Sequence, residues 1–177
     1  MEITNFNQKY QAQVIELWNR CCCFDAINAK KFLRQVIFDE NFDAALSFVA
    51  LEGKRVVGFG FGAKRKFPYM TRGMEPERGW INVLFVAPEC QRRGIASKIL
   101  EKIENELVAL GAKNITLGAY SPNYFFPGVD CENYVAAKAF FEKHGYIAGE
   151  EHWSMGRNLH GFQLSEKILG KKKAAED

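Results

Sequence analysis

The sequence has no apolar run long enough to cross a membrane, which takes about 18 or more apolar residues in succession. Its first residues, MEITNFNQKYQ, are polar and show neither the basic start nor the apolar stretch of a secretory signal peptide. We therefore expect no membrane partner and place the protein in the cytoplasm.

Cysteine patterns that would indicate metal binding or disulfides are also missing. The five cysteines are an odd number, and no pair has the spacing of a zinc finger. Three of them, Cys21, Cys22 and Cys23, are adjacent in the chain, so their side chains diverge in a helix or a strand. We interpret all five as reduced, small buried side chains and expect no metal.

Neither sign of charge is in large excess. The formal net charge of +3 is too small by itself to indicate a nucleic-acid-binding protein, and we expect no such partner. The short basic cluster of Lys64, Arg65 and Lys66 is interpreted as a solvated surface. Attraction of an acidic ligand is the alternative.

Apolar residues are plentiful: 47% of the 177 residues are hydrophobic and 14% are aromatic, which is enough for a sizeable core. This length favours one domain, which we expect to span residues 1–177. The charged residues 171–177 are expected to form a frayed tail. A homodimer is one of the partners considered.

The most informative stretch is residues 80–110. Residues 80–86 are rich in β-branched and aromatic side chains, which favours a buried strand that ends before Pro88. From Gly94 the apolar residues recur every three to four positions, which predicts an amphipathic helix. The first N–H groups of such a helix, next to a glycine turn, can bind an anion such as a phosphate. The alternative is an ordinary strand-to-helix turn with solvated arginines.

The same reasoning places the other elements. Strands are expected at residues 2–6, 44–51, 55–62 and 114–120, with the last strands at 146 and 153–159; further helices are expected at 8–22, 29–38 and 134–144. Gly58, Gly60 and Gly62 fall on one face of their strand. They indicate either a close neighbour against the backbone or room for nearby aromatic side chains.

Three motifs together give the chain its family resemblance. The segment from Gln91 to Ala96 reads Gln-Arg-Arg-Gly-Ile-Ala and fits the pattern Gln/Arg-x-x-Gly-x-Gly/Ala at a helix start. The hairpin FVALEGKRVVGFGFG precedes it, and a second signature follows at Ala137, Phe140, Phe141, Glu142, Lys143, Gly145 and Tyr146. In this order and spacing, the chain resembles the GCN5-related N-acetyltransferase (GNAT) superfamily.

The resemblance implies an α/β (α+β) fold with a mixed, mostly antiparallel sheet of about six or seven strands and helices on both faces. Its central parallel pair, residues 80–86 and 114–120, is joined by a right-handed crossover and splays apart. The resemblance also implies acetyl-CoA as co-substrate, held in the gap largely by backbone groups. The cofactor-binding residues it implies are Leu84, Phe85, Val86, Gln91, Arg92, Arg93, Gly94, Ile95, Ala96 and Ser97.

The expected acid and base are both replaced. The tyrosine that serves as acid in many members falls at Phe141, and the glutamate that some members use as base falls at Trp80. We take Tyr134 as the candidate acid, with Tyr120, Tyr124 and the thiol of Cys131 as other donors. Asp130 and Glu132 are the nearest carboxylates expected on the acceptor side. No histidine is assigned a catalytic role, because His144, His152 and His160 have no partners by spacing.

The loop at residues 120–133 is longer than a usual strand-to-helix connection of about 2–6 residues. We expect Tyr124, Phe125 and Phe126 to wall an acceptor pocket. The competing interpretation is that they cover the sheet edge or a dimer partner.

The function implied is transfer of the acetyl group of acetyl-CoA to a primary amine of a small molecule or peptide. The attack on the thioester would be direct, so some group must take a proton from the amine. The alternative is a non-catalytic module with the same fold that binds or senses acyl-CoA.

Overall fold

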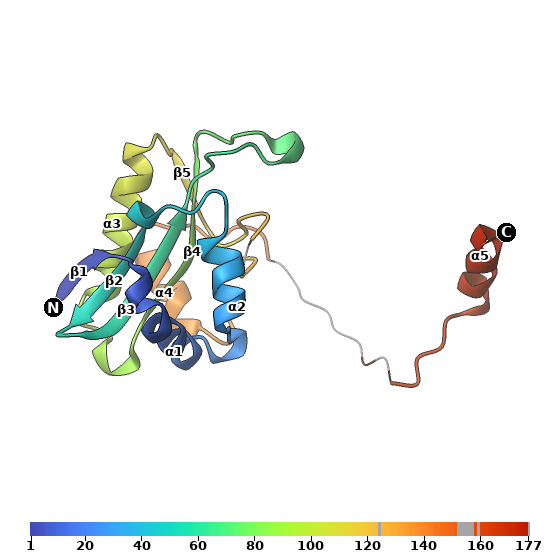
Figure 1. Ribbon diagram of the computed structural model, residues 1–177, viewed down its shortest axis with the longest axis horizontal. Coiled ribbons are helices and arrows are strands. Elements are labelled where there is room, and N and C mark those ends of the chain that lie inside the picture. The colour runs from blue at the N-terminus through green and yellow to red at the C-terminus, as the bar shows by residue number, and fades with distance from the viewer. Residues whose placement is uncertain (124, 152–157, 159, 177) are drawn as a thin grey trace. The chain divides into compact units, whose positions relative to one another are not determined.

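The computed structural model describes residues 1–123, 125–151, 158 and 160–176. The chain divides into two units, Met1–Ile147 and Ala148–Asp177 (Figure 1). The described residues of the second unit include one helix, α5 (Glu166–Glu176), which contains most of the segment predicted to be a frayed tail. The elements described below all belong to the first unit.

The first unit is built on a sheet whose strand order follows the chain. The strands are β1 (Glu2–Asn5), β2 (Ser47–Glu52), β3 (Arg55–Ala63), β4 (Arg78–Val86) and β5 (Asn114–Leu117). Neighbours are antiparallel except β4 and β5, which are parallel. The predicted mixed, mostly antiparallel sheet with β4 and β5 as its parallel pair is therefore confirmed, with β5 as the last rather than a central strand in the described order.

The described residues contain fewer strands than the six or seven predicted. Five strands occur in the described ranges, and Tyr146 lies in none of them. The other expected final strand, at 153–159, falls almost entirely outside the described residues. Residues 44–46 form a 3-10 turn, η4 (Ala44–Leu46), where the apolar run predicted strand.

Helices cover both faces of the sheet, as predicted. They are α1 (Gln11–Cys21), α2 (Ala29–Phe32) continued by the π-helical turn η3 (Leu33–Ile37), α3 (Ile95–Ala109) and α4 (Val135–Lys143). Trp18 of α1 contacts Phe85 of β4 at a ring-centroid distance of 5.6 Å. Gly60 of β3 faces Ile99 of α3. Phe85 pairs with Phe59, which is next to Gly60 in β3. Successive residues of a strand point to opposite faces of the sheet, so α1 and α3 lie on opposite faces (Figure 1).

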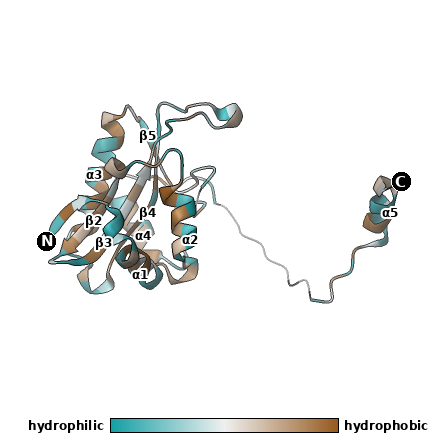
Figure 2. Cartoon of the chain, viewed as in Figure 1, coloured by the Kyte–Doolittle hydropathy of each residue, from teal (hydrophilic) through white to brown (hydrophobic). Residues whose placement is uncertain are grey.

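The glycines of β3 let α3 approach the sheet closely. A Cβ on Gly60 would lie 2.4 Å from Cγ2 of Ile99, and one on Gly62 would lie 2.6 Å from Cγ2 of Ile103. The close neighbour expected at this face is thus a helix, and its contacting side chains are aliphatic rather than aromatic. Apolar residues recur along α3 with polar residues between them (Figure 2). The buried residues of α3 include Ile95, Leu100 and Leu107.

The prediction that the basic cluster at 64–66 is a solvated surface holds for the exposed Lys66 and is wrong for Arg65. The side chain of Arg65 is fully buried, and its Nε donates a 2.8 Å hydrogen bond to Glu75. Its guanidinium lies 5.0 Å from the ring centroid of Trp80 and 5.4 Å from that of Tyr120. The sequence of three adjacent basic residues does not show that one of them has partners in the core.

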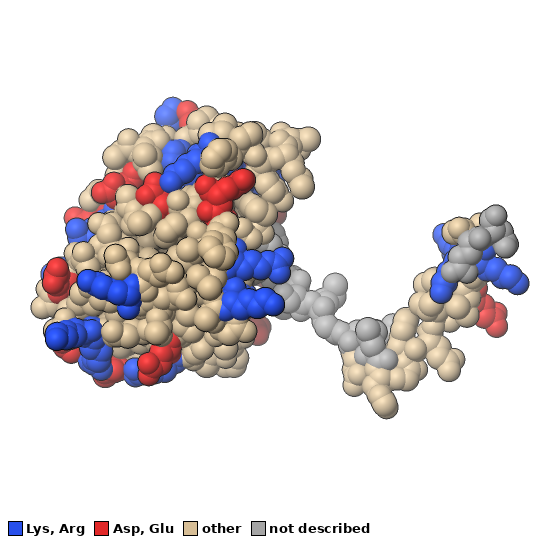
Figure 3. Space-filling model, viewed as in Figure 1, with Lys and Arg blue, Asp and Glu red and all other residues tan. Residues whose placement is uncertain are grey.

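The surface carries both signs of charge. On the face shown in Figure 3, lysine and arginine side chains are interspersed with aspartate and glutamate. Across the described part of the chain, no helix combines the length and apolarity needed to span a bilayer.

Candidate active site

The parallel strands β4 and β5 stay paired over only four residues each. Their register runs from Arg78 opposite Asn114 to Ile81 opposite Leu117, and the N–H of Gly118 donates to the carbonyl of Ile81 at 2.8 Å. Gly118 then takes a left-handed φ of 65°, where an added Cβ would lie 2.7 Å from the carbonyl oxygen of Phe126. The chain turns away here, and β4 continues without β5 beside it. We call this point, between Ile81 and Asn82, the fork.

A cavity of about 760 Å³ opens at the fork. It is bounded by β4 after the fork, the start of α3, the end of β5, the loop before α4, and α4 itself. Nine of the ten residues predicted to bind the cofactor line it: Leu84, Phe85, Val86, Gln91, Arg92, Gly94, Ile95, Ala96 and Ser97. The structure thus gathers at one cavity residues that sequence reasoning assigned to one ligand.

The N-terminus of α3 faces this cavity without a side-chain cap. Gly94 adopts a left-handed φ of 76°, and its carbonyl accepts the first helical hydrogen bond, from Lys98. The N–H groups of the turn before Lys98 are those that a helix leaves without internal partners. Together with the helix dipole, they make this end of the cavity suited to an anion.

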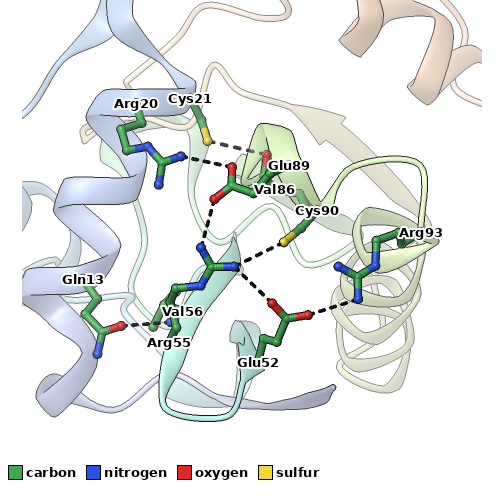
Figure 4. Close-up of polar contacts among 10 residues, drawn as sticks. All are labelled: Gln13, Arg20, Cys21, Glu52, Arg55, Val56, Val86, Glu89, Cys90 and Arg93. Carbon is green, nitrogen blue, oxygen red and sulfur yellow. Dashed lines mark hydrogen bonds and ion pairs between the residues drawn. The ribbon is translucent and has the colours of Figure 1, made fainter.

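Arg93 is the exception among the predicted cofactor residues. Its Nη2 donates to Oε1 of Glu52 at 3.1 Å, and Glu52 also binds Arg55 at 3.1 Å (Figure 4). Glu89 continues this surface network by pairing with Arg55 and Arg20, each at 3.0 Å. The side chain of Arg93 therefore balances an acidic partner outside the cavity lining.

Two further contacts meet at the end of β4, one from the loop that follows it and one from α1. Nε2 of Gln91 donates to the carbonyl oxygen of Val86 at 3.1 Å. The thiol of Cys21 donates to the same oxygen at 3.5 Å (Figure 4). Gln91 thus positions the turn that leads into α3.

Tyr134, the candidate acid, lies in the cavity lining immediately before α4. Its hydroxyl donates a 2.9 Å hydrogen bond to Oδ2 of Asp25. Burial, and then this contact with a carboxylate, raise the pKa of the Tyr134 phenol above its ordinary value. The phenol therefore stays protonated at neutral pH, and Asp25 is its present acceptor.

The other proposed proton donors lie elsewhere or bind other groups. Tyr120 is buried outside the cavity lining, where its hydroxyl donates to Asp39 and accepts from Asn41. Cys131 is exposed and outside the lining, and Tyr124 lies outside the described residues.

Of the two loop carboxylates, only Asp130 lines the cavity. Its carboxylate accepts hydrogen bonds from the N–H groups of Asn133 and Glu132, and that from Asn133 contributes most to lowering its pKa. Glu132 itself is exposed and outside the lining. Asp130 is thus ionised and committed largely to its own turn.

The aromatic loop contributes one of its two described phenylalanines to the cavity. Phe126 is in the lining and Phe125 is not. Both pack against Trp18 of α1, at ring-centroid distances of 6.2 Å and 4.9 Å respectively. The loop therefore serves the core as well as the cavity wall.

The positions of the family's usual acid and base have apolar or structural roles. Phe141 lines the cavity and packs edge-on against Tyr146 at a centroid distance of 5.4 Å. Trp80 lies beneath the guanidinium of Arg65, outside the cavity lining. Neither side chain has a proton to exchange with an amine or a thiol in this setting.

His144 is a cavity residue that sequence reasoning missed. Its Nδ1 lies 2.8 Å from the carbonyl oxygen of Phe140, and its Nε2 lies 3.0 Å from Oγ of Ser97. Since a carbonyl only accepts, Nδ1 carries a proton, and Nε2 shares a hydrogen bond with the Ser97 hydroxyl. This link joins the end of α4 to the first turn of α3. No local pattern could have revealed it, because the partners are 47 residues apart.

All five cysteines are free. The prediction that all five are buried is wrong for two of them. Cys22 and Cys90 are buried and Cys21 is partly so, whereas Cys23 and Cys131 are exposed. Burial raises the pKa of Cys21 to about 11 and that of Cys22 to about 12, so these two cavity thiols stay protonated. The described residues contain no group of three or more His, Cys, Asp or Glu that could hold a metal ion.

Comparison with solved structures gives neighbours of one fold. An aminoglycoside 6'-N-acetyltransferase from Acinetobacter haemolyticus matches with a TM-score of 0.62 and 13% identity, over 89% of this chain and 99% of that one. The ribosomal-protein-S18-alanine N-acetyltransferase of Escherichia coli matches with a TM-score of 0.60 and 17% identity, over 84% and 79%.

A third neighbour is part of a larger protein. The GCN5-related glucosamine N-acetyltransferase region of a fungal multi-domain GH3 β-N-acetylglucosaminidase matches with a TM-score of 0.70 and 22% identity. The match covers 98% of this chain and 20% of the fungal one. At these identities the three structures support the fold alone.

The family assignment comes from the sequence profile of the acetyltransferase (GNAT) family, which matches residues 12–146. This span includes the fork, the turn into α3 and the whole of α4. The chain therefore belongs to the acetyltransferase (GNAT) family.

Proposed function

We propose that the chain is an N-acetyltransferase that transfers the acetyl group of acetyl-CoA to a primary amine of a small molecule or peptide. One observation carries the proposal: the unpaired edge of β4 and the uncapped N-terminus of α3 face the same cavity. A strand edge suits an extended chain of amides, and a helix N-terminus suits a phosphate. Acetyl-CoA contains both an extended chain of amides, in its pantetheine arm, and a pyrophosphate.

The chain's groups fit this ligand without any charged side chain having to reach it. Backbone groups of Leu84, Phe85 and Val86 would pair with the pantetheine arm, which takes the place that β5 leaves after the fork. The N–H groups from Arg92 to Ser97 would hold the pyrophosphate. Gln91 and the Ser97–His144 contact would keep that turn in place. A role for Arg93 is expected only through its backbone.

Acetyl-CoA supplies an activated acyl group, and the protein's task is to position the amine and manage two protons. The amine must lose a proton to attack, and the leaving thiolate must gain one. Tyr134 is proposed as the group that donates to the thiolate, because its phenol is protonated and lines the cavity. Positioning of the two substrates would supply much of the acceleration.

An amine is proposed as the acceptor because the chain belongs to the acetyltransferase (GNAT) family and its structural neighbours are N-acetyltransferases. The solved relatives are named for transfer to aminoglycosides, glucosamine and a ribosomal-protein alanine. Phe126 is proposed to form part of the acceptor wall, and Phe125 supports it from outside the cavity lining. The cavity residues all lie in Met1–Ile147, so we assign the activity to that unit. The free cysteines support a reducing, cytoplasmic location.

The test has two parts. Calorimetric titration of the full chain with CoA and acetyl-CoA should show binding, and thiol release from acetyl-CoA should rise when a suitable amine from a broad panel is added. Phe141, which carries no proton at the usual acid position, is the observation that favours a non-catalytic acyl-CoA-binding module. Binding without thiol release on any amine would establish that module instead. If neither CoA nor acetyl-CoA binds, both functions are refuted.

A further inference from the structure

Asn82 occupies an unusual position on β4. Phe61 of β3 pairs with Val83, and the next residue, Gly62, pairs with Ile81. Asn82 is therefore an extra residue in β4, a β-bulge that has no partner in this register. On the other side of β4, the pairing with β5 ends at Ile81. Asn82 is thus the first residue after the fork, and a bulge there can re-aim a side chain.

The side chain of Asn82 is buried and unpaired. The residue is 3% exposed, and it lines the cavity. Within the described part of the chain, neither its Oδ1 nor its Nδ2 has a hydrogen-bond partner. Buried polar atoms nearly always have a partner, and leaving one unsatisfied costs more than a typical hydrogen bond gains.

We propose that Asn82 binds the amine acceptor, and that it selects amines bearing an oxygen close to the nitrogen. A primary amide offers one acceptor atom and one donor group side by side. Oδ1 would accept an N–H of the acceptor amine, which leaves the nitrogen lone pair free for the thioester. Nδ2 would donate to a neighbouring hydroxyl or carbonyl oxygen. Amino alcohols, amino sugars and α-amino amides present this pair of groups. The inference rests on the proposed acetyltransferase function.

The location of Asn82 favours the acceptor over the cofactor. The groups suited to acetyl-CoA lie further along the chain, at Leu84–Val86 and at the N-terminus of α3. Asn82 lies before them, at the closed end of the gap where β4 and β5 are still joined. A ligand that enters along the free edge of β4 would therefore reach Asn82 last, beyond the reacting carbonyl.

The test compares pairs of amines in which one member carries an oxygen close to the nitrogen and the other carries none. Thiol release is measured with 2-aminoethanol against propylamine, glucosamine against cyclohexylamine, and glycinamide against ethylamine. The unchanged protein should have a higher kcat/KM for the oxygen-bearing member of the preferred pair. Asn82→Leu should lower that value by roughly 10- to 100-fold, since a site built to hydrogen-bond a group discriminates by this order or more. The value for the plain amine should fall much less, because that amine loses only its contact with Oδ1. Asn105→Leu, an exposed change on α3, is the control and should leave both unchanged.

Two further measurements separate binding from a structural role. Asn82→Leu removes two unsatisfied polar atoms, so the thermal midpoint should stay the same or rise, and the Kd for CoA should not change. If Asn82 instead holds an ordered water needed by the fold, the midpoint falls and both members of each pair lose activity equally, which overturns the inference. Equal turnover of both members by the unchanged protein also overturns it, but leaves the acetyltransferase standing. CoA binding without turnover on any amine refutes the proposed function itself.

Discussion

The hydroxyl of Tyr134 lies 2.9 Å from Oδ2 of Asp25, although the two residues are 109 positions apart in the chain. The contact joins the residue that precedes α4 to the turn that follows α1 and gives the phenol an anionic partner at the cavity. Burial and this carboxylate both favour the protonated phenol. Tyr134 therefore keeps its proton over a wide pH range and is available to donate a hydrogen bond to a departing thiolate.

Tyr134→Phe should lower kcat by about 100-fold and change the Kd for CoA little, because it removes a proton donor and keeps the ring. Asp25→Asn should have a different effect. It removes a contact that raises the phenol pKa, so the alkaline decline of kcat should move to lower pH. The measurement is kcat against pH for the three proteins, with Tyr10→Phe as the control outside the cavity lining. Unchanged kcat in Tyr134→Phe would rule out the proposed acid.

Gly94 provides a second prediction, with a matched control at the other end of the same helix. Gly94 and Gly111 both have left-handed backbones, with φ of 76° and 84°, and an added Cβ meets nothing within 4 Å at either. Each change to alanine should therefore destabilise the fold by about 1 kcal/mol through backbone strain alone. Only Gly94→Ala should also weaken CoA binding, by about tenfold, because it disturbs the N–H groups of the first turn of α3. Chemical denaturation and calorimetric titration measure the two effects; equal Kd values in both variants would contradict the anion site.

The strand, turn and helix around this site could be predicted because their signals are local. The apolar run before Pro88 and the spacing of Ile95, Ile99 and Ile103 each depend on a few neighbouring residues. The glycines of β3 also indicated a close neighbour, since a missing Cβ is visible in sequence. The glycines could not indicate that the neighbour is α3, because α3 comes to lie against β3 only once the connection between β4 and β5 has folded.

The features missed by sequence reasoning all depend on contacts between distant residues. Arg65 is buried because Trp80 and Tyr120 cover it and Glu75 pairs with it, and its two charged neighbours in sequence conceal this. His144 gains its role from Ser97 on another helix. The bulge at Asn82 is a mismatch of register between β3 and β4, which no single strand reveals.

The ion pair between the buried Arg65 and the partly buried Glu75 provides a prediction about acid stability. Burial opposes the charge on Glu75, but the hydrogen bonds and charges of Arg65 and Arg78 together hold its pKa below the ordinary value of 4.5. A lowered folded-state pKa stabilises the fold fully above pH 4.5, and this contribution is lost as pH falls from there through the folded-state pKa. The unfolding free energy should therefore fall with acid in this window.

Glu75→Gln should flatten part of that acid dependence and lower the free energy of unfolding at pH 7 by about 3 kcal/mol, because it leaves the Arg65 guanidinium buried without a countercharge. Glu77→Gln is the matched control, since the ion pair of Glu77 with Lys113 is exposed and should contribute less than about 1 kcal/mol. Denaturation in urea at pH 7 and pH 4 gives both quantities. Similar losses in the two variants would show that Arg65 does not depend on Glu75.

Phe125 and Phe126 provide the last prediction, because their rings share Trp18 but only Phe126 lines the cavity. Phe126→Ala should raise the acceptor KM several-fold and leave the Kd for acetyl-CoA nearly unchanged. Phe125→Ala should lower the free energy of unfolding by about 2 kcal/mol, less than for a fully buried ring, with little change in acceptor KM. Steady-state kinetics on the preferred amine, titration with acetyl-CoA and urea denaturation distinguish the two. If both variants raised KM equally at full stability, Phe125 would also contact the acceptor; if either lost acetyl-CoA binding, the loop would serve the cofactor rather than the acceptor.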